Sequence, residues 1–286
     1  MGILDTLMGG NTAETAQPTG KYGSVDKISI KGLTQTYKDK DGHVNTVFDN
    51  TEFSIKDVAG KGQFVVLVGQ SGCGKSTILR YIAGLQKPTA GEIYINGKLK
   101  TEDDRIGMVE QRYSSLPWMT VLENVMLPLK IAGETDVKKM REVAMNWIQL
   151  MDLEKHANKY AQYPRLSGGQ LQRVAIARNL AANKEILLMD EPFGALDIRT
   201  RLKMQDLLCD VWTKMPGDPT ILLVTHDLSE AVYLADEIYV MSANPGKVAK
   251  VIDIKLPDAR TNALKRTREF QAYVNELEDI MISLNS

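Results

Sequence analysis

The chain contains little cysteine. Only Cys73 and Cys209 occur among 286 residues, and they form neither a zinc-binding pattern nor a disulfide framework. Such scarcity is typical of a protein from a reducing compartment. No apolar run approaches the ~18 residues that a membrane-spanning helix needs. Any role at a membrane is therefore expected to depend on a partner.

The sequence also lacks an excess of charge of either sign. Its 35 basic and 36 acidic residues give a formal net charge of -1, which argues against a general attraction to nucleic acid or to anionic lipid. We therefore expect no nucleic-acid partner. With 43% apolar and 25% charged residues, the composition is that of a globular protein that can bury a sizeable core.

The stretch before Val25 has no periodic pattern. Residues 9–23 are small and polar, which predicts a flexible leader over residues 1–24. From Val25 the pattern becomes that of β-strands, with a hairpin signal at Asp41-Gly42. Strands are predicted at Lys27–Ile30, Leu33–Tyr37, Thr46–Phe48 and Thr51–Ile55.

The loop from Gly69 to Ser76 fits the pattern G-x-x-x-x-G-K-[ST]. It follows Phe64–Val68, an apolar run typical of a strand buried on both faces, and it precedes the helical pattern of Thr77–Ala83. Its glycines allow backbone N–H groups to point at phosphate oxygens, and the helix dipole adds positive potential. Lys75 is expected on the β- and γ-phosphates, and the Ser76 hydroxyl on Mg²⁺. The loop therefore predicts a nucleoside triphosphate site.

From Val121 the residue pattern changes from that of strands to that of helices. Val121 to about Tyr163 has helical spacing and predicts a helical insertion whose Met and Trp residues lie in the core. The segment Leu116–Met119 could instead face a partner. Strands are predicted at Gly91–Gly97, Ile106–Gln111, Glu185–Met189, Thr220–Val224, Glu237–Met241 and Lys247–Ile252, and helices at Thr200–Met215 and Asn262–Leu284.

A second glycine turn, Ser167-Gly168-Gly169-Gln170, precedes a strongly helical stretch. The hydroxyl, the bare N–H groups and the helix dipole make it either a plain helix cap or a second anion site. One chain needs only one phosphate loop, so the second site would serve the nucleotide of another subunit. With Leu166 the turn reads LSGGQ, and the sequence resembles the nucleotide-binding subunits of ABC transporters, whose signature this is.

The buried strand before Pro192 ends in two carboxylates, Asp190 and Glu191. Adjacent side chains at a strand end point in different directions, so the two can hold separate roles. The resemblance implies that Asp190 orders the Mg²⁺ shell and that Glu191 polarises the attacking water. The alternative is an exposed acidic turn.

Four further positions match family motifs. Gln111 resembles the Q-loop glutamine, at the metal's water, and His226 the switch histidine, at the γ-phosphate. Asp197 resembles the D-loop aspartate that contacts the opposite subunit, although a turn or N-cap role is open. Tyr37 stands where the family places an aromatic ring on adenine, with Phe48 as the competing candidate. His43 and His156 have no such context and are expected at the surface.

The resemblance extends from Val25 to about Ile252. It implies an α/β fold, a P-loop NTPase core with an antiparallel β subdomain and a helical subdomain insertion. The ATPase domain is expected at residues 25–253, with the helical subdomain at about 112–170 and a C-terminal helical extension at 254–286.

The resemblance implies an ATP hydrolase with ATP and Mg²⁺ as cofactors. Catalytic roles fall on Glu191, His226 and Gln111, and the Mg²⁺ positions are Ser76, Gln111 and Asp190. The nucleotide-binding residues are Tyr37, Gly69, Ser71, Gly72, Cys73, Gly74, Lys75, Ser76, Thr77, Ser167, Gly168, Gly169, Gln170 and Asp197.

The expected partners are a second copy or a paralogous ATPase, transmembrane permease subunits and a substrate-binding protein. The place of action would be the cytoplasmic face of the inner membrane. Leu116–Val121 with Glu123–Val125, Met189–Asp197, and Asn244-Pro245-Gly246 are similar to the nitrate, sulfonate and taurine branch of bacterial importers. The alternatives are an exporter or lipid-handling ATPase, a non-transport ABC ATPase, and a regulatory binding module.

Overall fold

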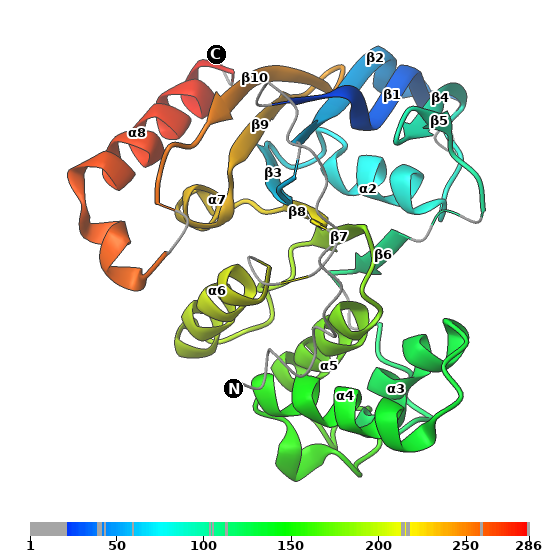
Figure 1. Ribbon diagram of the computed structural model, residues 1–286. Helices are drawn as coiled ribbons and strands as arrows, with labels where there is room; N and C mark the ends of the chain where they lie inside the picture. The colour runs from blue at the N-terminus through cyan, green and yellow to red at the C-terminus, as the bar shows by residue number, and fades with distance from the viewer. Residues whose placement is uncertain are drawn as a thin grey trace. The chain divides into compact units, whose positions relative to one another are not determined.

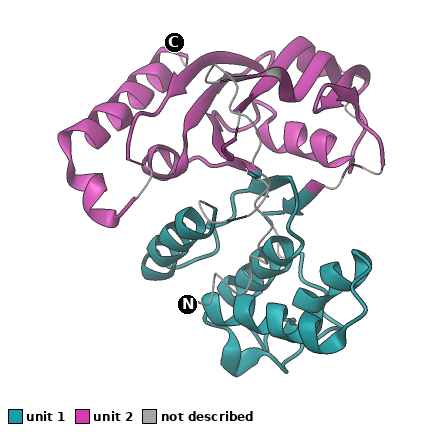
Figure 2. Ribbon diagram, in the orientation of Figure 1, with its two compact units in different colours: residues 1–14, 107–219 teal, residues 15–106, 220–286 magenta. Residues whose placement is uncertain are grey.

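The computed structural model describes residues 22–38, 42, 44–58, 60–102, 104, 106–111, 114–212, 215, 218–257 and 260–284. Most of the predicted leader therefore lies outside the described residues. Two compact units divide the chain (Figure 2). Unit 1 includes residues 107–219, and unit 2 includes residues 15–106 and 220–286.

Unit 2 contains a four-stranded sheet in the order β2-β1-β4-β5 (Figure 1). Its strands are β1 (Tyr22–Lys38), β2 (Val44–Val58), β4 (Ala90–Ile95) and β5 (Lys98–Leu99). All the pairings are antiparallel, and Lys38 lies opposite Val44. The predicted hairpin is thus confirmed, although residues 39–41 and 43 of its turn lie outside the described residues.

The strands predicted as short pieces are continuous in the structure. The pattern of the first strand breaks at Gly32, and the register against β2 shifts between Ile30 and Leu33. Gly32 has φ 63° and Asn50, in β2, has φ 46°. Left-handed residues of this kind bend a strand without ending its pairing. The breaks in alternation therefore mark bulges inside two long strands.

A second set of strands in unit 2 has the order β10-β9-β3-β8. These are β3 (Gln63–Gly69), β8 (Thr220–Val224), β9 (Glu237–Ser242) and β10 (Lys247–Asp253). β3 pairs parallel with both β8 and β9, and all seven of its residues are buried. This confirms the doubly buried strand predicted before the phosphate loop.

The helices of unit 2 are α2 (Lys75–Ala83), α7 (Leu228–Leu234), η2 (Asn262–Arg266) and α8 (Arg268–Ser283), and α8 packs against α7. The sequence reading did not predict α7. The Asp227 side chain caps it by accepting a 3.0 Å hydrogen bond from the Glu230 N–H. The spacing Asp-x-x-Glu is a helix-start pattern, and it would have allowed α7 to be predicted from the sequence.

Unit 1 is largely helical. Its elements are α3 (Val121–Ile131), α4 (Val137–Leu150), η1 (Glu154–His156), α5 (Gly168–Ala181) and α6 (Ile198–Trp212), with the neighbouring strands β6 (Ile106–Val109) and β7 (Ile186–Asp190). α3 packs against α4 and α5. Trp147 and Met151 are buried, as predicted for core positions. None of the helices in the described ranges combines the length and apolarity needed to cross a bilayer.

Candidate functional site

The predicted phosphate loop connects β3 to α2, as its sequence pattern requires. Lys75 is 8% exposed, and its Nζ donates hydrogen bonds of 2.8 Å to the carbonyls of Gly69 and Gln70. The Cys73 Sγ lies 3.7 Å from the same nitrogen. The backbone of the loop therefore surrounds the Lys75 side chain, and its carbonyl groups bind the ammonium inside the turn.

One aromatic ring fixes the shape of this loop. Gly74, the N-cap of α2, has φ 97°, and a Cβ there would lie 2.1 Å from the Phe48 Cζ. Gly246 meets the same ring and the Cys73 carbonyl, at 2.8 and 2.4 Å from its would-be Cβ. The Gly246 N–H also donates to the Val47 carbonyl at 2.7 Å. Contact excludes a side chain at both glycines, and at Gly74 the positive φ disfavours one as well.

The two candidate adenine-stacking rings have different environments. Phe48 is fully buried against the loop glycines, so its faces are already covered by protein. Tyr37 is 43% exposed, and its hydroxyl accepts a 3.0 Å hydrogen bond from Gln86 Nε2. Of the two rings, the Tyr37 ring is therefore the one that a ligand can reach.

His226 follows the last residues of β8 and precedes α7, also in unit 2. Its side chain is exposed. The chain on either side is fixed: the Thr225 N–H donates to the Leu67 carbonyl at 3.3 Å, and the Asp227 N–H donates to Thr225 Oγ1 at 3.1 Å. A ring held this way at a strand end can meet an anion without rearranging the backbone.

The two carboxylates at the end of β7 have the separate environments that the sequence predicted. Asp190 is 2% exposed, whereas the next residue, Glu191, is half-buried and has φ 45°. A left-handed non-glycine residue is uncommon and occurs often at functional positions. The Gln111 Nε2 donates to Glu191 Oε2 at 3.1 Å. Unit 1 thus brings two of the predicted catalytic residues together.

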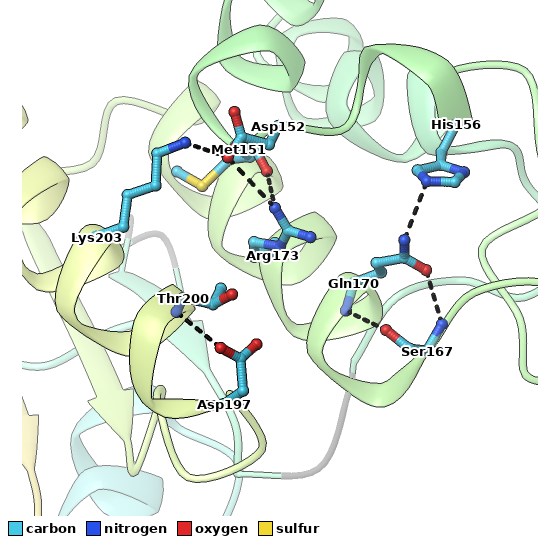
Figure 3. A network of polar contacts seen from close by, with 9 residues as sticks. All are labelled: Met151, Asp152, His156, Ser167, Gln170, Arg173, Asp197, Thr200 and Lys203. Carbon is cyan, nitrogen blue, oxygen red and sulfur yellow. Dashed lines mark hydrogen bonds and ion pairs between the residues drawn. The ribbon is translucent and has the colours of Figure 1, made fainter.

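The second glycine turn caps α5 through reciprocal bonds. The Gln170 N–H donates to Ser167 Oγ at 3.3 Å, and the Ser167 N–H donates to Gln170 Oε1 at 2.8 Å. The Gln170 Nε2 lies 3.0 Å from His156 Nε2 (Figure 3). His156, which was expected at the surface, is half-buried, because η1 carries its ring against the turn. His43 lies outside the described residues.

Asp197 begins α6 and accepts a 3.0 Å hydrogen bond from the Thr200 N–H (Figure 3). That bond lowers the pKa of the Asp197 carboxyl. The N-cap role left open by the sequence is therefore present. Nearby, Arg173 donates to the Met151 carbonyl at 2.6 Å, and Asp152 pairs with Lys203.

The donor set predicted for Mg²⁺ fits that ion chemically. Ser76, Gln111 and Asp190 offer a hydroxyl, an amide oxygen and a carboxylate, the hard oxygen ligands that Mg²⁺ prefers. Because Gln111 uses its Nε2 on Glu191, its Oε1 is the atom that would face a cation. No cluster of three His, Cys, Asp or Glu side chains suited to a metal occurs among the described residues.

The predicted site residues divide between the two units. Unit 2 holds Tyr37, the loop from Gly69 to Thr77 and His226. Unit 1 holds Gln111, Asp190, Glu191, Asp197 and the glycine turn at 167–170. The sequence reading missed His156 because its partner lies on a different element.

Known proteins are similar to this chain over most of its length. A family model described as ABC transporter matches residues 29–194. The nitrate import ATP-binding protein NrtD of Synechocystis sp. is 42% identical over 263 residues, which cover 89% of this chain and 94% of that protein. The aliphatic sulfonates import ATP-binding protein SsuB of Bacillus subtilis is 42% identical over 235 residues, covering 82% and 86%. Among solved structures, a dimer of the ATP-binding cassette MJ0796 in a post-hydrolysis state, bound to ADP and Pi, has a TM-score of 0.69 and 35% identity, covering 80% of this chain and 100% of that one.

Proposed function

The chain belongs to the ABC transporter family and is an ABC-type ATPase, and from that premise we propose that it hydrolyses ATP to drive solute import through membrane permease subunits. The observation that carries the proposal is the hydrogen bond between Gln111 and Glu191. This bond supports the assignment of Glu191 as the proton acceptor and of Gln111 as the amide that orients it. The import direction is supported by the names of the two relatives, which import nitrate and aliphatic sulfonates.

Binding starts from the arrangement of the phosphate loop. The Lys75 ammonium, which donates to the carbonyls of Gly69 and Gln70, turns toward the β- and γ-phosphate oxygens. The backbone N–H groups at the start of α2 and the dipole of that helix favour the same negative charge. Tyr37 covers the adenine. When bound, Mg²⁺ would neutralise phosphate charge, held by Ser76, Asp190 and Gln111.

Hydrolysis is assigned to residues at two strand ends. A water oxygen attacks the γ-phosphorus, its proton passes to the Glu191 carboxylate, and the bond to the ADP oxygen breaks. Gln111 fixes the carboxylate through the 3.1 Å hydrogen bond. His226 donates to the γ-phosphate oxygens as their charge changes.

The glycine turn at 167–170 is proposed to act on the ATP of a second subunit, either another copy or a paralogous ATPase. One chain carries one phosphate loop and one such turn, which suits a two-fold arrangement with two shared sites. The dimeric MJ0796 structure supports this arrangement. Closure of the pair would exclude water and place the Ser167 hydroxyl and the α5 dipole at the γ-phosphate.

The surface proposed for the permease includes Trp118, which is 67% exposed. The turn that carries it is fixed by the fully buried Asn124, whose side chain bonds both the N–H and the carbonyl of Leu116, at 2.8 and 3.0 Å. A rigid turn that exposes a large aromatic ring is typical of an interface anchor. In this proposal the protein acts at the cytoplasmic face of the inner membrane, and a substrate-binding protein delivers the solute.

The adenine contact gives a prediction about nucleotide affinity. Replacing Tyr37 with alanine is expected to weaken ATP binding about 5- to 150-fold, the equivalent of a ring–base stack of about 1–3 kcal/mol. Tyr37→Phe keeps the ring, loses the contacts that its hydroxyl makes with Gln86 and Tyr81, and should bind within about twofold of the parent. Fluorescence titration with ATP measures both. Equal affinity of Tyr37→Ala and the parent protein would remove the adenine assignment.

The permease surface gives a prediction about assembly. Trp118→Ala is expected to weaken binding to detergent-solubilised permease subunits about 30-fold, as loss of a buried aromatic anchor does. Ile131→Ala is the matched control, since Ile131 is 75% exposed at the end of α3. The measurement is affinity co-purification with mass spectrometry. Recovery of ribosomal or DNA-bound proteins without any permease would overturn the transport proposal.

A further inference from the structure

The orientation of the Gln170 amide is fixed by its neighbours in the glycine turn. The Ser167 N–H can only donate, so the group 2.8 Å away must be the Gln170 carbonyl oxygen. The amide nitrogen then faces His156, with 3.0 Å between Gln170 Nε2 and His156 Nε2 (Figure 3). A second donor at this position would repel the first, so the ring nitrogen must accept.

This contact determines the protonation state of His156. An Nε2 that accepts carries no proton, so the neutral ring carries its proton on Nδ1. Nδ1 is buried and has no hydrogen-bond partner in the part of the chain that the structure describes. The ring therefore has a single polar contact in the described ranges, and that contact is with the glycine turn.

The charges around the ring oppose its protonation. Burial is the largest cause that lowers the pKa of His156, followed by Lys159, Arg173 and Lys155. Arg173 projects from α5, and the nearby acidic group, Asp152, is paired with Lys203 and lies 4.0 Å from Arg173. The neutral ring, and with it the hydrogen bond to Gln170, is thus the form present at neutral pH. The bond is lost as the pH falls through the lowered pKa.

We propose that His156 is a positioning residue for the second glycine turn: its neutral ring accepts a hydrogen bond from Gln170, which in turn holds Ser167, and protonation of the ring releases the turn. Gln170 donates to His156 through its nitrogen and accepts from Ser167 through its oxygen, so one planar amide connects the two. Loss of the first bond leaves that amide able to rotate away from Ser167. An effect of His156 on the rate of ATP hydrolysis rests on the role proposed above for the turn at 167–170. The structural coupling of His156 to Ser167 through Gln170 does not depend on that role.

The structural half is tested by NMR on the full-length chain. In the parent protein, the Ser167 backbone ¹⁵N shift and the Gln170 side-chain amide shifts are expected to titrate with the same midpoint as the His156 ring. His156→Gln places an amide oxygen at the position of Nε2, so it keeps an acceptor but cannot titrate. In that variant the inflection should be absent. A Ser167 shift that ignores the titration of His156 would overturn the proposal.

The kinetic half uses the same variants, with kcat and KM for ATP measured across pH. His156→Ala should lower kcat about 5-fold at neutral pH, the loss of one hydrogen bond, and should leave ATP affinity of the lone chain unchanged. His156→Gln should restore kcat and remove the part of the acid-side fall in kcat that follows the titration of His156. Gln170→Glu can pair only with the protonated ring, so its kcat should rise where that of the parent falls.

The two possible failures give different results. If the Ser167 and His156 shifts titrate together while kcat is the same in His156→Ala and the parent, the coupling stands and the proposed role of the turn in hydrolysis is wrong. If the shifts are independent and kcat still falls in His156→Ala but is not restored in His156→Gln, the loss reflects packing alone, and the positioning role is wrong.

Discussion

Glu191→Gln is expected to lower the kcat for ATP hydrolysis about 100- to 10,000-fold, the range for loss of a general base, while ATP affinity stays within about twofold. Glutamine has nearly the same shape and still offers an oxygen to the Gln111 Nε2, which donates to Glu191 in the parent protein. The side chain therefore stays in place while its negative charge is removed. Steady-state phosphate release and equilibrium ATP binding, measured on the same preparation, separate the two effects.

The opposite end of the same strand provides a control. Glu185 immediately precedes β7 and is exposed, so Glu185→Gln makes the same chemical change far along the strand from the proposed chemistry. It should turn over ATP at the parent rate. A Glu191→Gln protein that also hydrolyses ATP at the parent rate would show that another group accepts the proton.

Lys75→Ala is expected to weaken ATP binding about 30-fold or more, since removal of one member of a buried charge pair costs about 2–5 kcal/mol. The lysine is almost fully buried, and its ammonium is already directed into the loop by two carbonyls. Hydrolysis at low ATP concentration should fall in parallel with binding.

Lys98→Ala is the matched control, because Lys98 is exposed on the short strand β5 of the same unit. It loses the same side chain without touching the loop. Thermal unfolding followed by circular dichroism reports whether either variant has changed the fold. If Lys75→Ala binds ATP as tightly as Lys98→Ala, the phosphate contact is misassigned.

The parts of the fold and site that could be predicted from the sequence are those that local pattern determines. The strand before the phosphate loop, the loop itself and the α5 cap each occupy a continuous stretch, and each is present as predicted. The family resemblance drawn from LSGGQ and its companion motifs is confirmed by the family model over residues 29–194. The site residues keep the status of predictions that the proposed experiments test.

The parts that could not be predicted depend on contacts between elements. His156 and Gln170 are 14 positions apart and lie on different helices, so no periodicity relates them. The sequence favours Tyr37 as the adenine-stacking ring but leaves Phe48 as a competing candidate, and the structure distinguishes them by the burial of Phe48 against Gly74. The bulges at Gly32 and Asn50 interrupt the alternation and make two long strands resemble four short ones.

The ring of Phe48 and the two bare positions around it, Gly74 and Gly246, have an implication for how this sequence can change. The ring occupies the volume that a methyl group at either glycine would need, and a smaller residue at position 48 would leave that volume empty beside the phosphate loop. The three positions therefore constrain one another: a side chain at either glycine would collide with the ring, so designed changes at these positions have to be chosen together.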